Sequence, residues 1–378
     1  MARFKFKLVV ASAKTIWLLV ALAACNFPLA AQTFYVGTCK SGSFPTISAA
    51  VNSSSVTPGS TIKICAGVYT EQVIISKDLT LQGLDGISNV LGSNPGGGSG
   101  AILESPGSFE VTFSPVFSNR FLSRIEIAPI IWVTAGTVNI QNVSVLGTGV
   151  ALPCCATEVG FYYASGASGT LNHVGFLDQA QAPAVGIWAE NANNSQTSVT
   201  IENSYSYAGI VAGSSVPGKL AVKITGNQVS LAQPEEDSFL ILFDGIYVYQ
   251  VSGTVEANFI SERGPADAGD AGIEVDGNAA TDVTISGNSI QTTNPWDPGD
   301  LVHVEDDWTG IIIDVDGATI KSNKISGAGV GINMGCHAAT VSGNTIMLAL
   351  SAFQNVPKGF TGVNSLFNNM YNNFDSPC

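Results

Sequence analysis

Carboxylates are concentrated in one part of the chain. The stretch 235–316 holds 18 of the 29 Asp and Glu residues, against one Arg (Arg263) and no Lys. Three of these acids, Glu274, Asp276 and Asp314, fall in short apolar runs that are typical of strands. Neighbouring carboxylates ionise together only with a cation or a shared proton. Calcium, with roughly six to eight oxygen ligands, would satisfy them; two carboxylates can also cleave a glycosidic bond, and a plain solvated face is the third alternative.

Aromatic residues recur at one position of a short pattern, Gly-Ile-x-Val and its variants. The branched residues of such a strand point inward, so the x residue and the residue two positions later point outward. Before the acidic stretch and at its start, these outward positions hold Trp132, Tyr162, Trp188, Tyr247 and Tyr249. A row of exposed rings suits stacking against sugars and predicts a polysaccharide partner. The alternative is that aromatic residues are simply common in strands.

The strands that carry these residues belong to a repeat. Four copies in 245–346 read GIYVYQVSGTVEANFI, GIEVDGNAATDVTISGNSI, GIIIDVDGATIKSNKI and GINMGCHAATVSGNTI. A unit this short cannot bury its own apolar face, so successive copies must stack as a solenoid. We count about ten or eleven rungs, and stacked strands about 4.8 Å apart would make Asp276 and Asp314 neighbours.

Spacing within the copies defines the register. The inward anchor of the second strand lies seven positions after the last inward residue of the first, as in Val133 to Ile140, Val248 to Val255, Ile313 to Ile320 and Met334 to Val341. Three residues beyond the anchor an asparagine recurs, at Asn227, Asn258, Asn288, Asn323, Asn344 and Asn369. Asn tolerates the left-handed backbone of a tight turn. Buried amides need partners, so we expect these six side chains to form one hydrogen-bonded ladder.

Composition excludes several classes of protein. Of 378 residues, 45% are hydrophobic and 12% are charged, which is not the composition of a disordered chain. The formal net charge of -14 disfavours nucleic acid and anionic membrane surfaces as partners.

Residues 1–31 have the pattern of an export signal. A basic start precedes the apolar run Ile16–Ala24, which is too short to span a bilayer, and cleavage after Ala31 would give a secreted protein. Alternatively, a Leu-Ala-Ala-Cys motif resembles a lipobox, which would end the signal at residue 24 and leave a lipid anchor at Cys25. The protein is then periplasmic or associated with the outer membrane. No later apolar run is long enough to cross a membrane.

An exported chain can oxidise its cysteines. Either cleavage leaves six of them for pairing, and six allow many connectivities. Two pairs would each staple one end of the solenoid, and we expect the disulfides Cys39–Cys65 and Cys336–Cys378. Cys154 and Cys155 have no assigned partner. The absence of Cys-x-x-Cys and the presence of only three His argue against zinc.

The N-terminal part is predicted to contain a short helix followed by strands. Ser43–Ser54 places Ile47, Ala50 and Val51 on one helical face, and Pro45 suits its first turn. Alternating strand residues follow in Thr61–Cys65, while Ala101–Glu104 and Phe109–Phe113 are candidate strands of low regularity. The run FPTISAAVNSSS, continued by PGSTIKICAGVYTEQVIISKDLTLQG, resembles the start of secreted parallel β-helix proteins of the pectate-lyase-like superfamily.

That resemblance implies an all-β fold, a single right-handed parallel β-helix with a short N-terminal capping helix. Residues 32–70 would form the cap and first strand, and 71–378 the β-helix. Pectate lyases bind calcium through carboxylates of such strands and use an arginine as base. The resemblance therefore implies a calcium site at Glu274, Asp276 and Asp314. Arg263 would remove a proton from an acidic sugar, with Asp276 and Asp314 assisting catalysis.

Motifs of the individual enzyme families are missing from the sequence. There is no Gln-Asp-Thr of pectin methylesterases, no Gly-His-Gly of polygalacturonases and no Trp-Ile-Asp-His of pectate lyases. We predict an exported protein that contacts extracellular or cell-wall polysaccharide, with a calcium-dependent lyase or a glycoside hydrolase as the enzymatic version. The alternative is a non-catalytic surface or adhesion protein in which the solenoid is a rigid rod.

Overall fold

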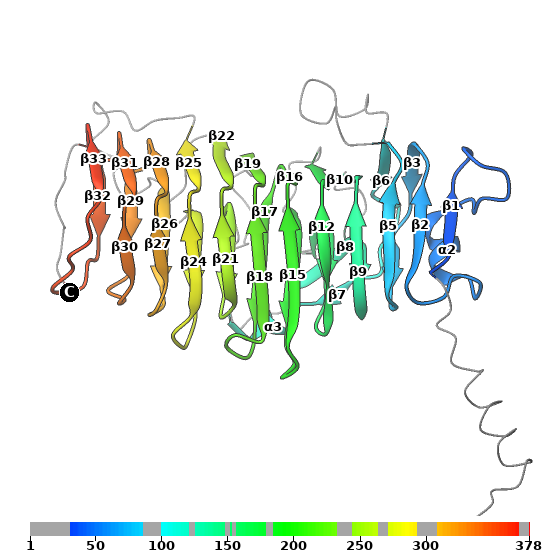
Figure 1. The fold of residues 1–378 in the computed structure, drawn as a ribbon, viewed down its shortest axis with the longest axis horizontal. Helices are drawn as coiled ribbons and strands as arrows, with labels where there is room; N and C mark the ends of the chain where they lie inside the picture. The colour runs from blue at the N-terminus through cyan, green and yellow to red at the C-terminus, as the bar shows by residue number, and fades with distance from the viewer. Residues whose placement is uncertain are drawn as a thin grey trace, which may run out of the picture.

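The computed structural model describes residues 31–85, 100–120, 125–147, 152, 156–178, 184–232, 244–263, 271–292, 308–369 and 378. The chain winds into an elongated stack of rungs (Figure 1), and each regular rung contributes one strand to each of three sheets. Each sheet has eleven strands, and all the pairings but one are parallel. The predicted parallel β-helix of ten or eleven rungs is confirmed.

Sheet A contains the second strand of each rung and carries the inward anchors. The predicted anchors Ile140, Val255, Ile320 and Val341 are all buried, which confirms the seven-residue spacing. Its strands are, in spatial order, β1 (Thr33–Val36), β2 (Ser60–Ile64), β5 (Leu79–Gly83), β9 (Gly136–Gln141), β12 (Ala167–Asn172), β15 (Thr197–Glu202), β18 (Leu220–Thr225), β21 (Ser252–Glu256), β24 (Asp282–Ser286), β27 (Thr319–Lys321) and β30 (Thr340–Ser342).

Sheet B contains the third strand of each rung. The low-regularity strand expected at Ala101–Glu104 is present with those bounds, as β6. The strands of sheet B are, in spatial order, β3 (Gly67–Thr70), β6, β10 (Val143–Gly147), β13 (Gly175–Asp178), β16 (Tyr205–Ser206), β19 (Gln228–Ala232), β22 (Phe259–Arg263), β25 (Ser289–Thr292), β28 (Lys324–Ser326), β31 (Thr345–Met347) and β33 (Ser365–Phe367).

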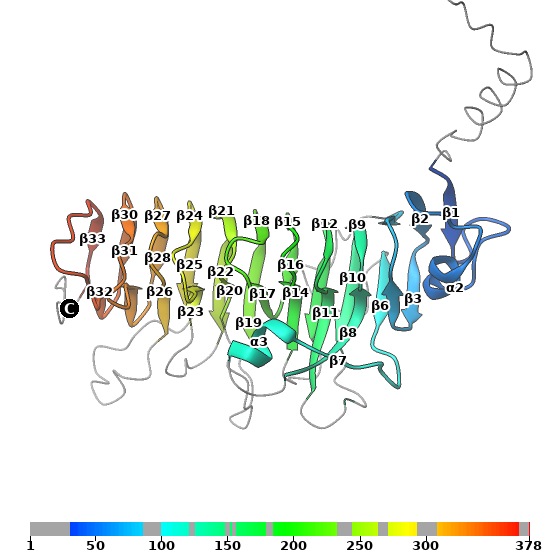
Figure 2. The ribbon, with the colours of Figure 1, turned by 90° about the horizontal axis from the view of Figure 1, so that it is seen from below.

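Sheet C contains the first strand of each rung and carries the candidate site. Its strands are, in spatial order, β4 (Val73–Ile75), β8 (Glu126–Val133), β11 (Ala156–Tyr163), β14 (Ala184–Asn191), β17 (Gly209–Ser214), β20 (Ile246–Tyr249), β23 (Ala271–Asp276), β26 (Thr309–Asp314), β29 (Val330–Asn333) and β32 (Ser351–Gln354). The expected rung at Phe109–Phe113 is wrong. Its last two residues form β7 (Thr112–Phe113), which pairs antiparallel with β8 and leads into the helix α3 (Pro115–Arg120) beneath sheet C (Figure 2).

An asparagine ladder runs along the turn between sheets A and B. Each amide Nδ2 donates to the Oδ1 of the next asparagine, at 2.9–3.0 Å, through Asn227, Asn258, Asn288, Asn323, Asn344 and Asn364. Five of the six predicted members are confirmed. Asn369 is not a member, because the ladder residue precedes the sheet B strand and Asn369 follows β33. The left-handed residue is the one before the asparagine, for example Ala257 with φ 54°.

The helix α2 (Ile47–Asn52) covers the N-terminal end of the stack (Figure 2). Its buried residues Ile47, Ala50 and Val51 are the predicted face. The helix is shorter than the expected Ser43–Ser54 and begins two residues after Pro45, because Thr46 is the N-cap and accepts a hydrogen bond from the Ala49 N–H at 3.1 Å. The predicted capping helix is therefore confirmed, and it shields strand edges that would otherwise be open to pairing.

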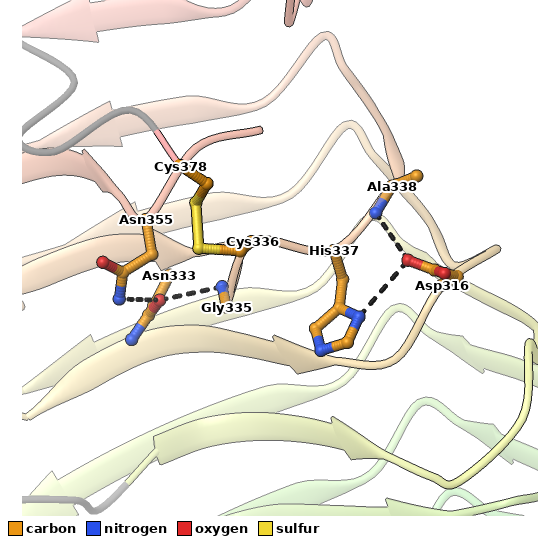
Figure 3. Close-up of a disulfide and its surroundings, with 8 residues drawn as sticks. All are labelled: Asp316, Asn333, Gly335, Cys336, His337, Ala338, Asn355 and Cys378. Atoms are coloured by element: carbon orange, nitrogen blue, oxygen red, sulfur yellow. Dashed lines mark hydrogen bonds and ion pairs between the residues drawn. A yellow bond between two sulfur atoms is a disulfide. The ribbon is translucent and has the colours of Figure 1, made fainter. Parts of the chain in front are cut away.

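Both expected disulfides are present, one near each end of the stack. Cys39 pairs with Cys65, and Cys336 pairs with Cys378 (Figure 3). Close to the second, the His337 Nδ1 lies 3.2 Å from Asp316 Oδ1, and the Ala338 N–H donates to the same oxygen at 2.8 Å. This backbone hydrogen bond, with help from the histidine, lowers the pKa of the exposed Asp316 carboxyl.

Three predictions lie outside the described residues. These are the export signal in residues 1–31 except for its last residue, the lipid anchor at Cys25, and the states of Cys154 and Cys155. Within the described part of the chain, neither helix is long and apolar enough to cross a membrane.

Candidate carboxylate site

The predicted register brings Asp276 and Asp314 together on the outer face of sheet C. They are Cα partners at the ends of the neighbouring strands β23 and β26, and Tyr249 precedes Asp276 in the same row. Parallel strands lie about 4.8 Å apart, so the two carboxyl groups project from adjacent backbones. Glu274 is on the same face, as the Cα partner of Tyr247 and Ile312.

The two aspartates differ in their surroundings. Both occupy outward strand positions, for which exposure to solvent is expected, but Asp276 is only 4% exposed, while Asp314 is half-buried. The phenol of Tyr247, on the preceding strand, donates to Asp276 Oδ2 at 2.8 Å. Tyr247 and Tyr249 of β20 thus lie next to the buried Asp276, and the strand pattern alone did not indicate this burial.

Asp314 packs against the backbone of the next rung. Gly335 is in the left-handed region, with φ 51°, and a Cβ at this position would lie 2.4 Å from Asp314 Oδ1. A side chain at residue 335 would therefore displace the carboxylate. Glycine at this turn gives the Asp314 carboxyl room beside the carboxylate row.

The described residues do not form the expected calcium site. Among them, no group of three His, Cys, Asp or Glu side chains is arranged to hold a metal ion, and this includes Glu274, Asp276 and Asp314. Outward residues two apart on one strand are separated by about 7 Å, which spreads Glu274 away from the aspartate row. The described residues thus do not form a three-carboxylate metal centre, and calcium binding stays a prediction.

Arg263 ends β22 in sheet B, whereas both aspartates are in sheet C. Its backbone pairs with Ala232 of β19. Its side chain is outside the described part of the structure, so its role as a base stays a prediction.

The five aromatic residues also follow the predicted rows. Trp132, Tyr162 and Trp188 are successive Cα partners, and Val211 links Trp188 to Tyr247 in the same row. However, the expected open row of rings is wrong for four of the five. Tyr162, Trp188, Tyr247 and Tyr249 are at most 4% exposed, and Trp132 is half-buried.

The helix α3 accounts for this burial. Phe117 of α3 packs against Trp188, Tyr247 and Tyr249, with ring centroids 5.2, 5.7 and 6.0 Å apart. Gly213 of β17 leaves space for the Phe117 ring, because a Cβ there would lie 2.3 Å from it. The N-terminal half of sheet C is therefore a packed interface.

Glu190 is a functional candidate that the sequence reasoning did not select. Its carboxylate is buried beneath α3 and accepts hydrogen bonds from the Ser114 hydroxyl at 2.5 Å, from the Tyr162 phenol and from the Val116 N–H. Burial raises the pKa of Glu190 to about 7, although these hydrogen bonds oppose the shift. The sequence could have indicated Glu190, because it occupies the same outward row of sheet C as Asp276. The row did not indicate that α3 covers this carboxyl group.

Comparisons with known proteins support the fold and leave the activity open. No protein-family model matches the chain, and no curated protein matches it. Among solved structures, it is similar to a GH136 lacto-N-biosidase from Eubacterium ramulus, with 10% identity and a TM-score of 0.51 over 94% of this chain and 70% of that chain. At this identity the likeness shows a shared β-helix fold alone.

Proposed function

We propose that this protein is an exported β-helix protein that acts on polysaccharide, with Asp276 and Asp314 as its reacting carboxylates. The observation that carries the proposal is their pairing in register on adjacent strands of sheet C. Carboxyl groups about 5 Å apart are the arrangement of retaining glycosidases. The similarity to a protein named as a lacto-N-biosidase is in keeping with a glycan substrate.

The surroundings of the two aspartates suggest a division of roles. Tyr247 holds one oxygen of the buried Asp276 in a fixed position, which suits a nucleophile that attacks the anomeric carbon. Asp314 is half-buried and within reach of water, which suits the acid that protonates the departing glycosidic oxygen. Water, deprotonated by Asp314, would then release the sugar from Asp276.

A calcium-dependent lyase acting on acidic glycan is the narrower version of the same proposal. The acidic stretch favours it, but the described residues do not assemble three metal ligands. Hydrolysis by the two aspartates needs no calcium and is the leading version of the proposal. The non-catalytic alternative, a rigid surface or adhesion rod, predicts glycan binding without turnover.

One assay separates these possibilities. The protein is incubated with neutral and uronate polysaccharides, and both new reducing ends and the absorbance of unsaturated ends are followed, with and without EDTA. We expect reducing ends without unsaturation, and a loss of about 100-fold or more in Asp276→Asn and Asp314→Asn. Asp282→Asn is the matched control, since this exposed aspartate begins the next strand along the chain, β24. Wild-type protein that releases no ends from any polymer would remove the enzymatic proposal.

A further inference from the structure

The C-terminal end of the chain reverses the charge of the region before it. The stretch 235–316 has 18 acids and one Arg, whereas 317–378 has one acid, Asp375, and contains Lys321, Lys324 and Lys358. All three lysines are exposed, on β27, on β28 and in the segment after β32. In a chain of net charge -14, an anion therefore meets much less repulsion at this end than along the acidic stretch that precedes it.

A cavity of about 600 Å³ lies at the same end, between β30 and the segment 357–363. β30 is the last strand of sheet A, and 357–363 passes it without forming a strand. In the described chain, the two are joined where the Gly343 N–H, just after β30, donates to the Val363 carbonyl at 2.6 Å. We call the resulting space the C-terminal groove; its volume is in the range of sites for small ligands.

The walls of the C-terminal groove combine one ring with several polar groups. Phe360 contributes the ring and is held by packing on Phe353, with centroids 5.7 Å apart. Hydroxyl groups come from Thr340, Ser342 and Thr361, which are exposed and make no side-chain hydrogen bond within the described chain. Such groups remain available to a ligand that carries hydroxyls of its own.

Cations flank these hydroxyls. Lys358 lines the groove, and Lys321 is the Cα partner of Ser342 on the neighbouring strand. The acid nearest in sequence to the lining residues is Asp316, next to Gly317, and its oxygen is already bonded to His337 and to the Ala338 N–H. Among the side chains described near the rim, two lysines thus lie close to one carboxylate that is already hydrogen-bonded.

We propose that the C-terminal groove binds a carboxylate-bearing sugar unit of an acidic polysaccharide. The sugar ring lies on Phe360, its hydroxyls meet those of the groove, and its carboxylate faces Lys321 and Lys358. This deepens the proposed function by naming the substrate class, and it rests on that function only in taking polysaccharide as the ligand. Gly317, which lines the groove, is three residues after Asp314, which places the groove close to the proposed reacting carboxylates along the chain.

Titration calorimetry with polygalacturonate oligomers tests the proposal. Fully methyl-esterified oligomers serve as the uncharged comparison. We expect the free acid to bind the Asp276→Asn/Asp314→Asn protein, and Lys321→Ala/Lys358→Ala to weaken binding about tenfold at low salt, since exposed ion pairs are each worth a few-fold. Phe360→Ala should weaken binding of the free acid as well. Lys63→Ala is the matched control, an outward lysine of sheet A at the opposite end of the stack.

Each outcome is decisive for the groove. Equal binding of the free acid and the ester, no binding of either, or equal losses in the double lysine variant and in Lys63→Ala would overturn the proposal. Because the aspartate double variant cannot turn over substrate by the proposed mechanism, its binding is independent of catalysis. If the wild-type protein is inactive but the free-acid oligomers still bind, the proposed enzymatic function is wrong and the proposed binding by the C-terminal groove stands.

Discussion

The two halves of sheet C have the same strand register but differ in their outward side chains. From β8 to β20 five of the outward residues are aromatic, and α3 packs against several of them; at β23 and β26 the outward residues are three carboxylates and Ile312. The inward residues of both halves are buried in the core and are mostly aliphatic, with Phe161 and Tyr163 of β11 as aromatic members. The backbone therefore fixes the rows, while the outward side chains decide whether a row presents rings that pack against α3 or carboxyl groups on neighbouring strands.

The largest effect is expected from removing the ring that seals the aromatic half. Phe117→Ala should lower the free energy of unfolding of the α3 region by about 3–4 kcal/mol, because a fully buried phenyl ring is lost. Chemical denaturation and acrylamide quenching of tryptophan fluorescence measure this. Phe113→Ala, at a more exposed ring of the same segment, is the control. If quenching rises equally in both variants, Phe117 of α3 does not shield the buried tryptophan of sheet C from solvent.

Glu190 should make the covered half sensitive to pH. Its folded-state pKa of about 7 is above the ordinary value of 4.5. The contribution to stability is therefore fully present below about pH 4.5 and is lost as the pH rises through about 7, a change on the order of 3 kcal/mol.

Urea unfolding between pH 4 and pH 8 measures this dependence. Glu190→Gln should flatten it, and Glu202→Gln, at a partly exposed carboxyl on sheet A, should not. A wild-type free energy of unfolding that rises with pH across this interval would contradict the raised pKa of the buried Glu190.

A smaller effect is expected where the two halves meet. Tyr247→Phe removes the hydroxyl that donates to Asp276, which should lower stability by about 1–2 kcal/mol and leave the ring packing on Phe117 intact. Thermal unfolding together with the glycan assay measures both consequences. A stability loss as large as that of Phe117→Ala would mean that the tyrosine acts through packing.

The smallest effect on stability is expected at Asp314. Because this carboxyl is half-buried, Asp314→Asn should change the free energy of unfolding by less than about 0.5 kcal/mol. Differential scanning calorimetry checks this. A much larger loss of stability would show that the Asp314 carboxyl group has a structural role at the Gly335 turn.

The repeat made the register predictable. Inward branched residues at fixed spacing allow only one stacking of strands with a buried core, so the pairing of Asp276 with Asp314 followed from residues far apart in the chain. The end of the ladder was less predictable. Leu366 has the pattern of a sheet A anchor, but the last rung has no regular sheet A strand, so Asn364 takes the ladder position.

The cover over sheet C was not predictable from the same pattern. Pro115–Arg120 has no repeat to place it, and its contacts with Trp188 are long-range. Outward aromatic residues are equally compatible with solvent, ligand or a covering helix, because burial depends on a segment that is not their neighbour in sequence. For the same reason the burial of Asp276 became visible only with Tyr247 in place.

The most direct test of the central claim is the rate of product release by Asp314→Asn beside wild type, on a polysaccharide that wild type cleaves. The carboxylate row predicts a loss of about 100-fold or more in the variant, with an unchanged melting temperature. A variant that folds normally and releases product at the wild-type rate would contradict it.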